Sequence, residues 1–189
     1  MRKIILYLQI SLDGVVSDSD KWMSFSDDIL TDAIDYYKTL DTVIFGSNTY
    51  PFLSDYWQTA EQSSNSPLEK EFAKRINDIN KIVLSRSPKE LTWKNSQHLG
   101  FTDTQDLIKT LQNLKNQPGK NISVEGGITI WKLLLQNNLF DELLLYVHPT
   151  IFGKGIKLFD EINSQAILKL KYSKTLDKGV VLLHYEKTN

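Results

Sequence analysis

The 189-residue chain contains no cysteine, which excludes disulfides, thiolate nucleophiles and cysteine-ligated zinc sites together. It also has no excess of one charge, since the formal net charge is −1 and the basic residues are spread along the chain. That balance gives no support for nucleic acid or an anionic membrane as a partner. The absence of cysteine fits a reducing compartment.

Long apolar runs are also missing, and no stretch approaches the roughly 20 apolar residues of a membrane span. Residues 1–14 begin with the basic residues of a signal peptide, but Asp13-Gly14 follows a short apolar run and no small-residue cleavage site is present. We therefore interpret residues 4–10 as a first strand. We expect the protein to be cytoplasmic and not attached to a membrane. Its expected partner is a small molecule.

Two common nucleotide-binding motifs are absent as well. There is no G-x-G-x-x-G fingerprint, so the chain is not an ordinary Rossmann dehydrogenase, and there is no P-loop lysine motif. His98, His148 and His184 are far apart, and no pair has the spacing of a metal site. A structural or surface role is therefore favoured for each histidine, and no metal is expected.

Apolar patterns predict one α/β domain that spans residues 1–189. Strands are expected at 4–10, 42–45, 81–84, 122–124, 142–147, 166–175 and 180–187. Helices are expected at 27–40, 68–77, 104–115 and 127–136, with a short helical start and then a loop across 48–67. The alternation predicts a mostly parallel sheet with helices on both faces, closed by a C-terminal antiparallel hairpin at Asp177-Lys178-Gly179.

Ligands of an open parallel sheet bind outside the carboxyl ends of its strands, so the loops there carry the functional prediction. Gly126-Gly127 lies between a strand and a helix, which permits close approach of a phosphate to a helix N-terminus. Gly46, Ser47 and Thr49 offer a second helix start with hydroxyl donors. Arg86 between two serines suits the 2′-phosphate of NADPH.

Each of these loops has a plainer interpretation when it is taken alone. Gly126-Gly127 is equally well a tight turn, Ser85-Arg86-Ser87 a solvated turn, and Asp13-Gly14 an ordinary turn. Their combination favours a dinucleotide site, because the expected strand order places all of them at the same edge of the sheet.

At these residues the chain resembles the dihydrofolate reductase-like superfamily. The matching pieces are SLDG at 11–14, G-x-x-T-Y at 46–50, Ser-Arg at 85–86, V-E-G-G at 124–127, D-E-L at 141–143 and a glycine loop within 149–159. The most similar branch looks like the reductase domain at the C-terminus of the bifunctional riboflavin-biosynthesis deaminase/reductase. The resemblance covers nearly the whole chain, and residues 124–159 are its most specific part.

The resemblance implies an eight-stranded mixed sheet, a homodimer, and hydride transfer from NADPH to a small heterocyclic or sugar-derived substrate. Asp13 and Glu125 become candidate catalytic groups, because a carboxyl beside the nicotinamide could orient a substrate hydroxyl or supply a proton. The candidate cofactor-binding residues are Gly46, Ser47, Thr49, Ser85, Arg86, Gly126, Gly127 and Ile128.

The chain also departs from the family pattern. Ser47 stands where the family usually has arginine, which removes one cationic phosphate contact. With Arg86 assigned to the cofactor, Arg2 and Arg75 are the only other arginines, so few bidentate partners are left for a substrate phosphate. The lack of cysteine excludes the zinc deaminase partner domain from this chain, because that chemistry needs a P-C-x-x-C half-site.

Two alternative functions stay open. Dihydrofolate reduction requires a buried carboxylate on the first helix, where Asp28, Asp32 and Asp35 are candidates, although a surface helix also carries acids. Trp22 is expected in the substrate pocket or, equally, in the core. The other alternative is a non-catalytic NADPH-binding protein, which the serine in the arginine position keeps open. We expect Gly127→Val to abolish cofactor binding and to preserve the fold, because its side chain would block the phosphate.

Overall fold

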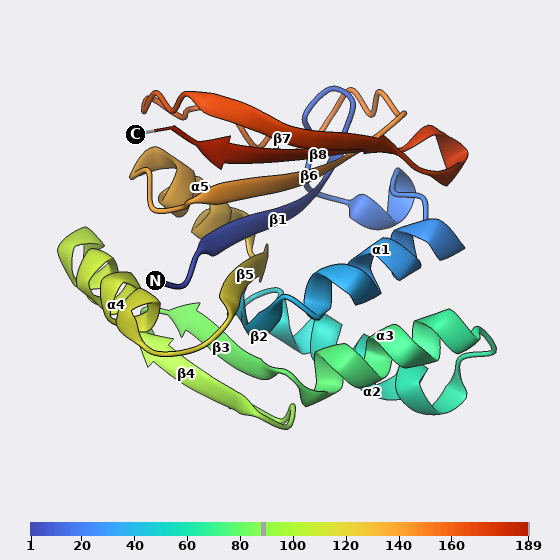
Figure 1. The fold of residues 1–189 in the computed structure, drawn as a ribbon, viewed down its shortest axis with the longest axis horizontal. Helices are drawn as coiled ribbons and strands as arrows, with labels where there is room; N and C mark the ends of the chain where they lie inside the picture. Colours follow the sequence, from blue (N-terminus) through green and yellow to red (C-terminus); the bar gives the residue numbers. More distant parts are fainter. Residues whose placement is uncertain (88–89, 189) are drawn as a thin grey trace.

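A single mixed sheet runs through the molecule in the computed structural model, which describes residues 1–87 and 90–188 (Figure 1). The strands of these residues are β1 (Ile4–Ser11), β2 (Leu40–Gly46), β3 (Asn80–Ser85), β4 (Ser96–Gly100), β5 (Asn121–Gly126), β6 (Glu142–His148), β7 (Leu168–Thr175) and β8 (Val181–Lys187). Their order across the sheet is β4-β3-β2-β5-β1-β6-β8-β7. The strands from β4 to β6 are parallel, whereas β8 and β7 are antiparallel to their neighbours.

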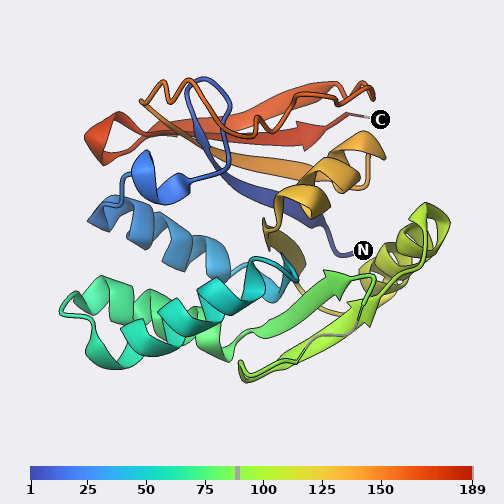
Figure 2. The same cartoon turned by 180° about the vertical axis from the view of Figure 1, so that it is seen from behind.

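Helices cover both faces of this sheet, as the two opposite views show (Figures 1 and 2). One face carries α1 (Asp27–Tyr37), α2 (Tyr50–Ser63) and α3 (Pro67–Asp78), and the other carries α4 (Thr104–Asn116) and α5 (Ile128–Gln136). Two short 3₁₀ helices, η1 (Ser19–Lys21) and η2 (Asp177–Gly179), lie in connections. The predicted α/β architecture with its C-terminal hairpin is confirmed.

The two-residue alternation of the strands decides which side chains meet which helices. In β1, Ile4 and Leu6 pack in the core beneath α4 and α5, whereas Ile5 and Tyr7 face the opposite side. In β5, Val124 belongs to the core beneath α5. Glu125 must therefore point to the face that α1, α2 and α3 cover.

The prediction of a loop over much of residues 48–67 is wrong, because Tyr50–Ser63 forms the helix α2. Pro51 is compatible with the first turn of a helix, where no amide donor is needed. Trp57 then packs edge-on against Phe72 of α3, with ring centroids 4.8 Å apart. This contact between two helices supplies the stability that the polar local sequence does not indicate.

The residue patterns also missed β4, the eighth strand that the family resemblance implies. Ser96–Gly100 is short and largely polar, and it lies at the edge of the sheet, where it pairs in parallel with β3. An edge strand with few buried side chains has little apolar alternation to reveal it. In the part of the chain that the structure describes, no helix has the length and apolar character needed to cross a membrane.

Candidate functional site

The predicted phosphate loops follow three strands that are neighbours in the sheet. β3, β2 and β5 lie side by side, so their carboxyl ends bring Ser85, Gly46 and Gly126 to one edge. The starts of α2 and α5 therefore lie next to each other at this edge. Two adjacent helix N-termini offer unpaired backbone N–H groups to an anionic ligand.

Gly127 makes this packing possible. Its φ of +102° is unfavourable for residues with a side chain, and a Cβ atom there would lie 2.9 Å from the Cα of Gly46. A Cβ on Gly126 would likewise lie 2.8 Å from Cγ2 of Thr49. The expectation that Gly127→Val preserves the fold stays a prediction, and the added side chain would push against the backbone of Gly46 and strain the turn itself.

A cavity of about 410 Å³ opens beside this turn, between the sheet and the helices α1, α2 and α3. Thr49, Gly126, Gly127 and Ile128 line it on the side of the two helix starts. Apolar side chains from the three helices form much of the opposite wall, and among them are Ile29, Leu30, Ala33, Leu53, Trp57, Phe72 and Ile76. The volume lies within the range of small-molecule sites.

Glu125 lies directly before the glycine pair and lines the cavity. Its Oε2 accepts a hydrogen bond from the Tyr37 hydroxyl at 2.5 Å, whereas its Oε1 is buried with no partner among the described residues. Burial raises the pKa of this carboxyl to about 7, against the opposing effects of Tyr37 and Ser123, whose hydroxyls lower it. A carboxyl with that pKa can either hold or release a proton near neutral pH.

Three tyrosines surround this carboxyl. The rings of Tyr7 and Tyr36 are stacked with centroids 5.3 Å apart, and the Tyr36 hydroxyl donates to Ser123 Oγ at 2.9 Å. Burial, followed by the nearby charge of Glu125, raises the pKa of Tyr37 well above its usual value. Burial likewise raises the pKa of Tyr7 and of Tyr36, so all three phenols stay neutral. Tyr37 is the one with a described hydrogen bond to the acid.

Asp13 has a different position from Glu125. Its carboxylate accepts hydrogen bonds from the Ser11 hydroxyl and from the backbone N–H groups of Phe152 and Gly153. These bonds lower its pKa to about 2, the largest contribution coming from Ser11. The described lining of the cavity does not include Asp13. The carboxylate instead joins the loop after β1 to the glycine loop, and residues 16–19 of the first loop line the cavity.

A buried histidine completes this end of β1. His148 accepts the Ser24 N–H at Nδ1, 3.1 Å away, and its Nε2 lies 2.7 Å from Gln9 Oε1, so Nε2 carries the proton. Burial lowers its pKa to about 4, which keeps the ring neutral. Trp22 packs edge-on against it and donates to the Ser17 carbonyl. Trp22 thus supports the cavity loop without appearing in the described lining.

The acids proposed on the first helix are held in other contacts. Asp28 accepts hydrogen bonds from the Ser26 hydroxyl and the Asp177 N–H, which fastens η2 to α1. Asp32 accepts the Tyr146 hydroxyl at 2.7 Å and pairs with Lys174. Neither acid belongs to the described lining of the cavity. Their assignment to a substrate pocket stays a prediction without geometric support.

The predicted 2′-phosphate loop lies further along the same edge. Ser85 Oγ donates to the Ser87 carbonyl and lies 3.0 Å from His98 Nε2. Arg86 is exposed, with its guanidinium carbon 5.8 Å from the centre of the Phe101 ring. Ser47 follows β2, the strand between β3 and β5, so it lies between this loop and the glycine turn. Their arrangement leaves Arg86 available to a ligand that extends away from the cavity.

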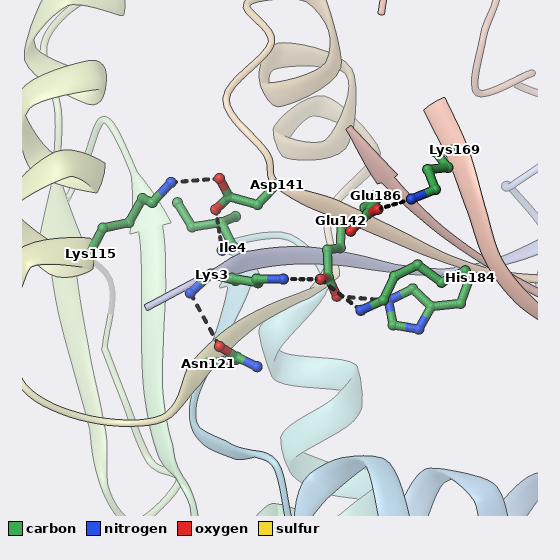
Figure 3. Close-up of polar contacts among 10 residues, drawn as sticks. Lys3, Ile4, Lys115, Asn121, Asp141, Glu142, Lys169, His184 and Glu186 are labelled. Atoms are coloured by element: carbon green, nitrogen blue, oxygen red, sulfur yellow. Dashed lines mark hydrogen bonds and ion pairs between the residues drawn. The ribbon is translucent and has the colours of Figure 1, made fainter. Parts of the chain in front are cut away.

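The D-E-L segment lies at the start of β6, and therefore at the opposite, amino-terminal edge of the sheet. Figure 3 shows its polar contacts. Asp141 accepts the Ile4 N–H and pairs with Lys115. Glu142 is buried, and Lys3, Lys171 and His184 all bond to its carboxylate. This cluster joins the first strand to the C-terminal hairpin, so the motif has a structural role.

Sequence patterns missed the side chains that enclose Glu125. Tyr7 and Gln9 both line the cavity, and they interrupt the otherwise apolar first strand at alternate positions. That interruption is a usable signal, because polar groups inside a buried strand need a reason to be there. The wall supplied by α2 could not be predicted once that segment was taken as a loop.

Comparison with known proteins agrees with this architecture. Residues 2–182 match the family described as RibD C-terminal domain. An uncharacterized protein of Bacillus subtilis, YyaP, is 28% identical over 188 residues, which is 97% of this chain and 94% of YyaP.

Solved structures of low sequence identity share the fold. RibD of Acinetobacter baumannii superposes with a TM-score of 0.69 at 21% identity, over 100% of this chain and 59% of that one. Dihydrofolate reductase of Enterococcus faecalis, complexed with NADP(H), gives a TM-score of 0.62 at 16% identity, over 99% of this chain and 97% of that one. The predicted dihydrofolate reductase-like fold is confirmed.

Proposed function

Because the chain belongs to the RibD C-terminal domain family, we propose that it is an NADPH-dependent reductase of a small heterocyclic or sugar-derived substrate. One observation carries the proposal: an acid whose pKa is raised to about 7 lies in a cavity directly beside a glycine turn and two helix N-termini. A proton source next to a phosphate-binding turn is what reduction by hydride transfer requires.

The residues present fit the cofactor. Gly126 and Gly127 leave a turn without side chains at the start of α5, and the first N–H groups of α5 and α2 would hold the pyrophosphate. Thr49 and Ile128 border the cavity at this turn, while Ser85 and Arg86 would hold the 2′-phosphate. NADPH, when bound, would supply the hydride.

The protein's own groups would handle the proton. Tyr37 bonds Oε2 of Glu125, and Oε1, which is buried and has no partner in the described hydrogen bonds, would carry the proton to be transferred. The apolar wall limits water around this carboxyl and keeps its pKa near neutrality. Asp13 is ionised at neutral pH, and we assign it a positioning role through the two loops that it joins.

NADPH oxidation, followed by absorbance with a pyrimidine ribosyl phosphate and then with dihydrofolate, tests the reaction. Wild type should turn over one such substrate, and Glu125→Gln should lower kcat by about 100-fold or more, as loss of a general acid does. Turnover of dihydrofolate would favour dihydrofolate reduction, and unchanged kcat in the variant would remove Glu125 from the reaction. NADPH binding without turnover of any substrate would indicate a non-catalytic binder.

Cofactor choice is tested by thermal shift. NADPH should raise the Tm more than NADH does, and Arg86→Ala should remove most of the difference, because a charge-assisted phosphate contact contributes about 1.5–3 kcal/mol. Equal shifts with the two cofactors would contradict the 2′-phosphate assignment. Homodimer formation and a cytoplasmic location stay predictions, and sedimentation analysis would test the first.

A further inference from the structure

The edge strand β4 lies next to β3, whose following loop would hold the 2′-phosphate of NADPH (Figure 1). In the parallel pairing of these strands, Val83 lies beside His98 and Ser85 lies beside Gly100. The His98 ring nevertheless reaches the carboxyl end of β3, where its Nε2 lies 3.0 Å from Ser85 Oγ and 3.2 Å from the Ser85 carbonyl oxygen. A side chain of β4 therefore contacts the loop at its first residue.

The direction of the hydrogen bond between His98 and Ser85 follows from the other partner of the serine. Ser85 Oγ donates its one hydrogen to the Ser87 carbonyl at 2.5 Å, so this hydroxyl can only accept from His98. The Ser85 carbonyl oxygen is an acceptor in any case. Nε2 of His98 therefore carries a hydrogen and donates it, which holds Ser85 in the orientation that closes the turn over residues 85–87.

The arginine in the middle of this turn is also supported from the end of β4. Arg86 is exposed, and its guanidinium carbon lies 5.8 Å from the centre of the Phe101 ring. Phe101 directly follows β4 and is buried in the core beneath α4 and α5, so its ring has a fixed position. A guanidinium that lies over an aromatic face keeps the N–H groups at its edge free for an anion.

The loop after β2 increases the importance of this arrangement. It contains Ser47, Asn48 and Thr49, and none of these residues carries a charge. Of the described residues 85–87, Arg86 is the charged one. Between these two segments, recognition of a phosphate depends on one arginine, and ordering its loop before the ligand binds lowers the entropic cost of binding.

We propose that His98 is a positioning residue for recognition of the 2′-phosphate: through Ser85 it orders the turn that carries Arg86, while Phe101 supports the guanidinium. The inference rests on the proposed function for the identity of the ligand. Neither His98 nor Phe101 belongs to the described lining of the cavity, so their effect concerns the choice of cofactor rather than the substrate.

Calorimetric titration of the full chain with NADPH and with NADH tests the proposal, because the two cofactors differ only in the 2′-phosphate. The measured quantity is the ratio of their dissociation constants. His98→Leu should reduce the preference for NADPH by about fivefold, since it removes one hydrogen bond that orders the loop, and should leave NADH binding within about twofold. His98→Gln should retain most of the preference, because its amide N–H can still donate to Ser85.

Two further variants complete the set. Phe101→Leu keeps an apolar side chain in the core but removes the aromatic face, so it should reduce the preference by about threefold. Gln97→Leu, at an exposed position of the same strand, is the control and should leave the ratio unchanged. An unchanged ratio in both His98→Leu and Phe101→Leu, with circular dichroism confirming that they fold, overturns the proposal. Equal losses in His98→Leu and His98→Gln also overturn it.

The same titrations separate this inference from the proposed function. If wild type prefers NADPH and His98→Leu keeps that preference, only the positioning role is rejected. If wild type binds the two cofactors equally, or binds neither, the 2′-phosphate assignment of the proposed function fails and the inference fails with it.

Discussion

Glu125, which is partly buried, and Glu142, which is buried, lie on the same face of the sheet but at opposite ends of their strands. Glu125 accepts a hydrogen bond from Tyr37, and burial raises its pKa to about 7 although Tyr37 and Ser123 both lower it. Glu142 is also buried, and although burial alone would raise its pKa, hydrogen bonds from His184, Lys3 and Lys171 hold it well below the usual value. Figure 3 shows Lys3 and His184 converging on its carboxylate.

This difference shows that hydrogen-bond and ion-pair partners, rather than burial alone, decide whether the pKa of an enclosed carboxyl is raised or lowered. A carboxylate with three cationic or hydrogen-bonding partners is fixed in its ionised form and serves stability. A carboxyl with neutral partners keeps a raised pKa, which is typical of groups that take part in proton transfer. The amino edge of this sheet therefore holds a stabilising ion cluster, and the carboxyl edge is where we propose that ligands bind.

The largest effect on stability is expected at the amino edge. Glu142→Gln should lower the free energy of unfolding by about 3 kcal/mol, because it leaves Lys3 and Lys171 without their counter-charge and weakens the acceptor for His184. Urea unfolding at pH 7 measures it. Glu186→Gln, directly opposite in β8 and paired with exposed Lys169, is the control and should change little. Equal losses in the two variants would contradict the special role of Glu142.

The second prediction concerns how the stability contributed by Glu125 changes with pH. Because the folded pKa of Glu125 is raised, wild type should lose stability as the pH rises from about 4.5 to about 7, by up to ~3 kcal/mol. Glu125→Gln should lack this loss and be the more stable protein above pH 7. Thermal unfolding across this range checks the sign. Parallel curves for wild type and variant would show that Glu125 titrates normally.

A smaller change is expected in the pKa of Glu125 when the hydrogen bond to its Oε2 is removed. Tyr37→Phe keeps the buried ring but removes the hydroxyl, so the pKa of Glu125 should rise further, by about one unit. The carboxyl titration followed by carbon NMR reports it directly. A fall in the pKa would mean that water replaces the hydroxyl and solvates the acid better than tyrosine does.

The smallest effect is expected from Lys171→Met. This lysine shares Glu142 with two other partners and its side chain is 34% exposed, so the loss should be about 0.5–1 kcal/mol. Comparison with Glu142→Gln then shows how much of the cluster depends on the central acid. A loss as large as that of Glu142→Gln would place the stabilisation in this one pair instead.

Much of the fold followed from periodicity, and the exceptions have physical reasons. The buried strands β1, β2 and β6 were predicted within a few residues, because apolar side chains on both faces mark them clearly. The edge strand β4 has too few buried side chains to be recognised. Helix α2 depends on Trp57 packing against α3, which is a tertiary contact.

Part of the candidate site could also be predicted from the sequence, because the pattern of strands and helices indicates a parallel sheet. Parallel strand order alone brings Gly46, Ser85 and Gly126 to one edge, so the loops after the strands could be chosen from the sequence. The sequence could not show which acids face the cavity. Asp13 and Glu125 both follow or end a strand, yet one accepts two backbone N–H groups and the other lines an apolar wall.

The sequence by itself determined the α/β architecture, the glycine turn before α5 and the absence of cysteine chemistry, since these depend on local pattern and residue type. Only the tertiary structure decided that the pKa of Glu125 is raised, that Glu142 is held in its ionised form, and that the described cavity lining has no cation. The reason is that a pKa and a pocket depend on desolvation and on partners from distant segments, and these meet only when the chain has folded.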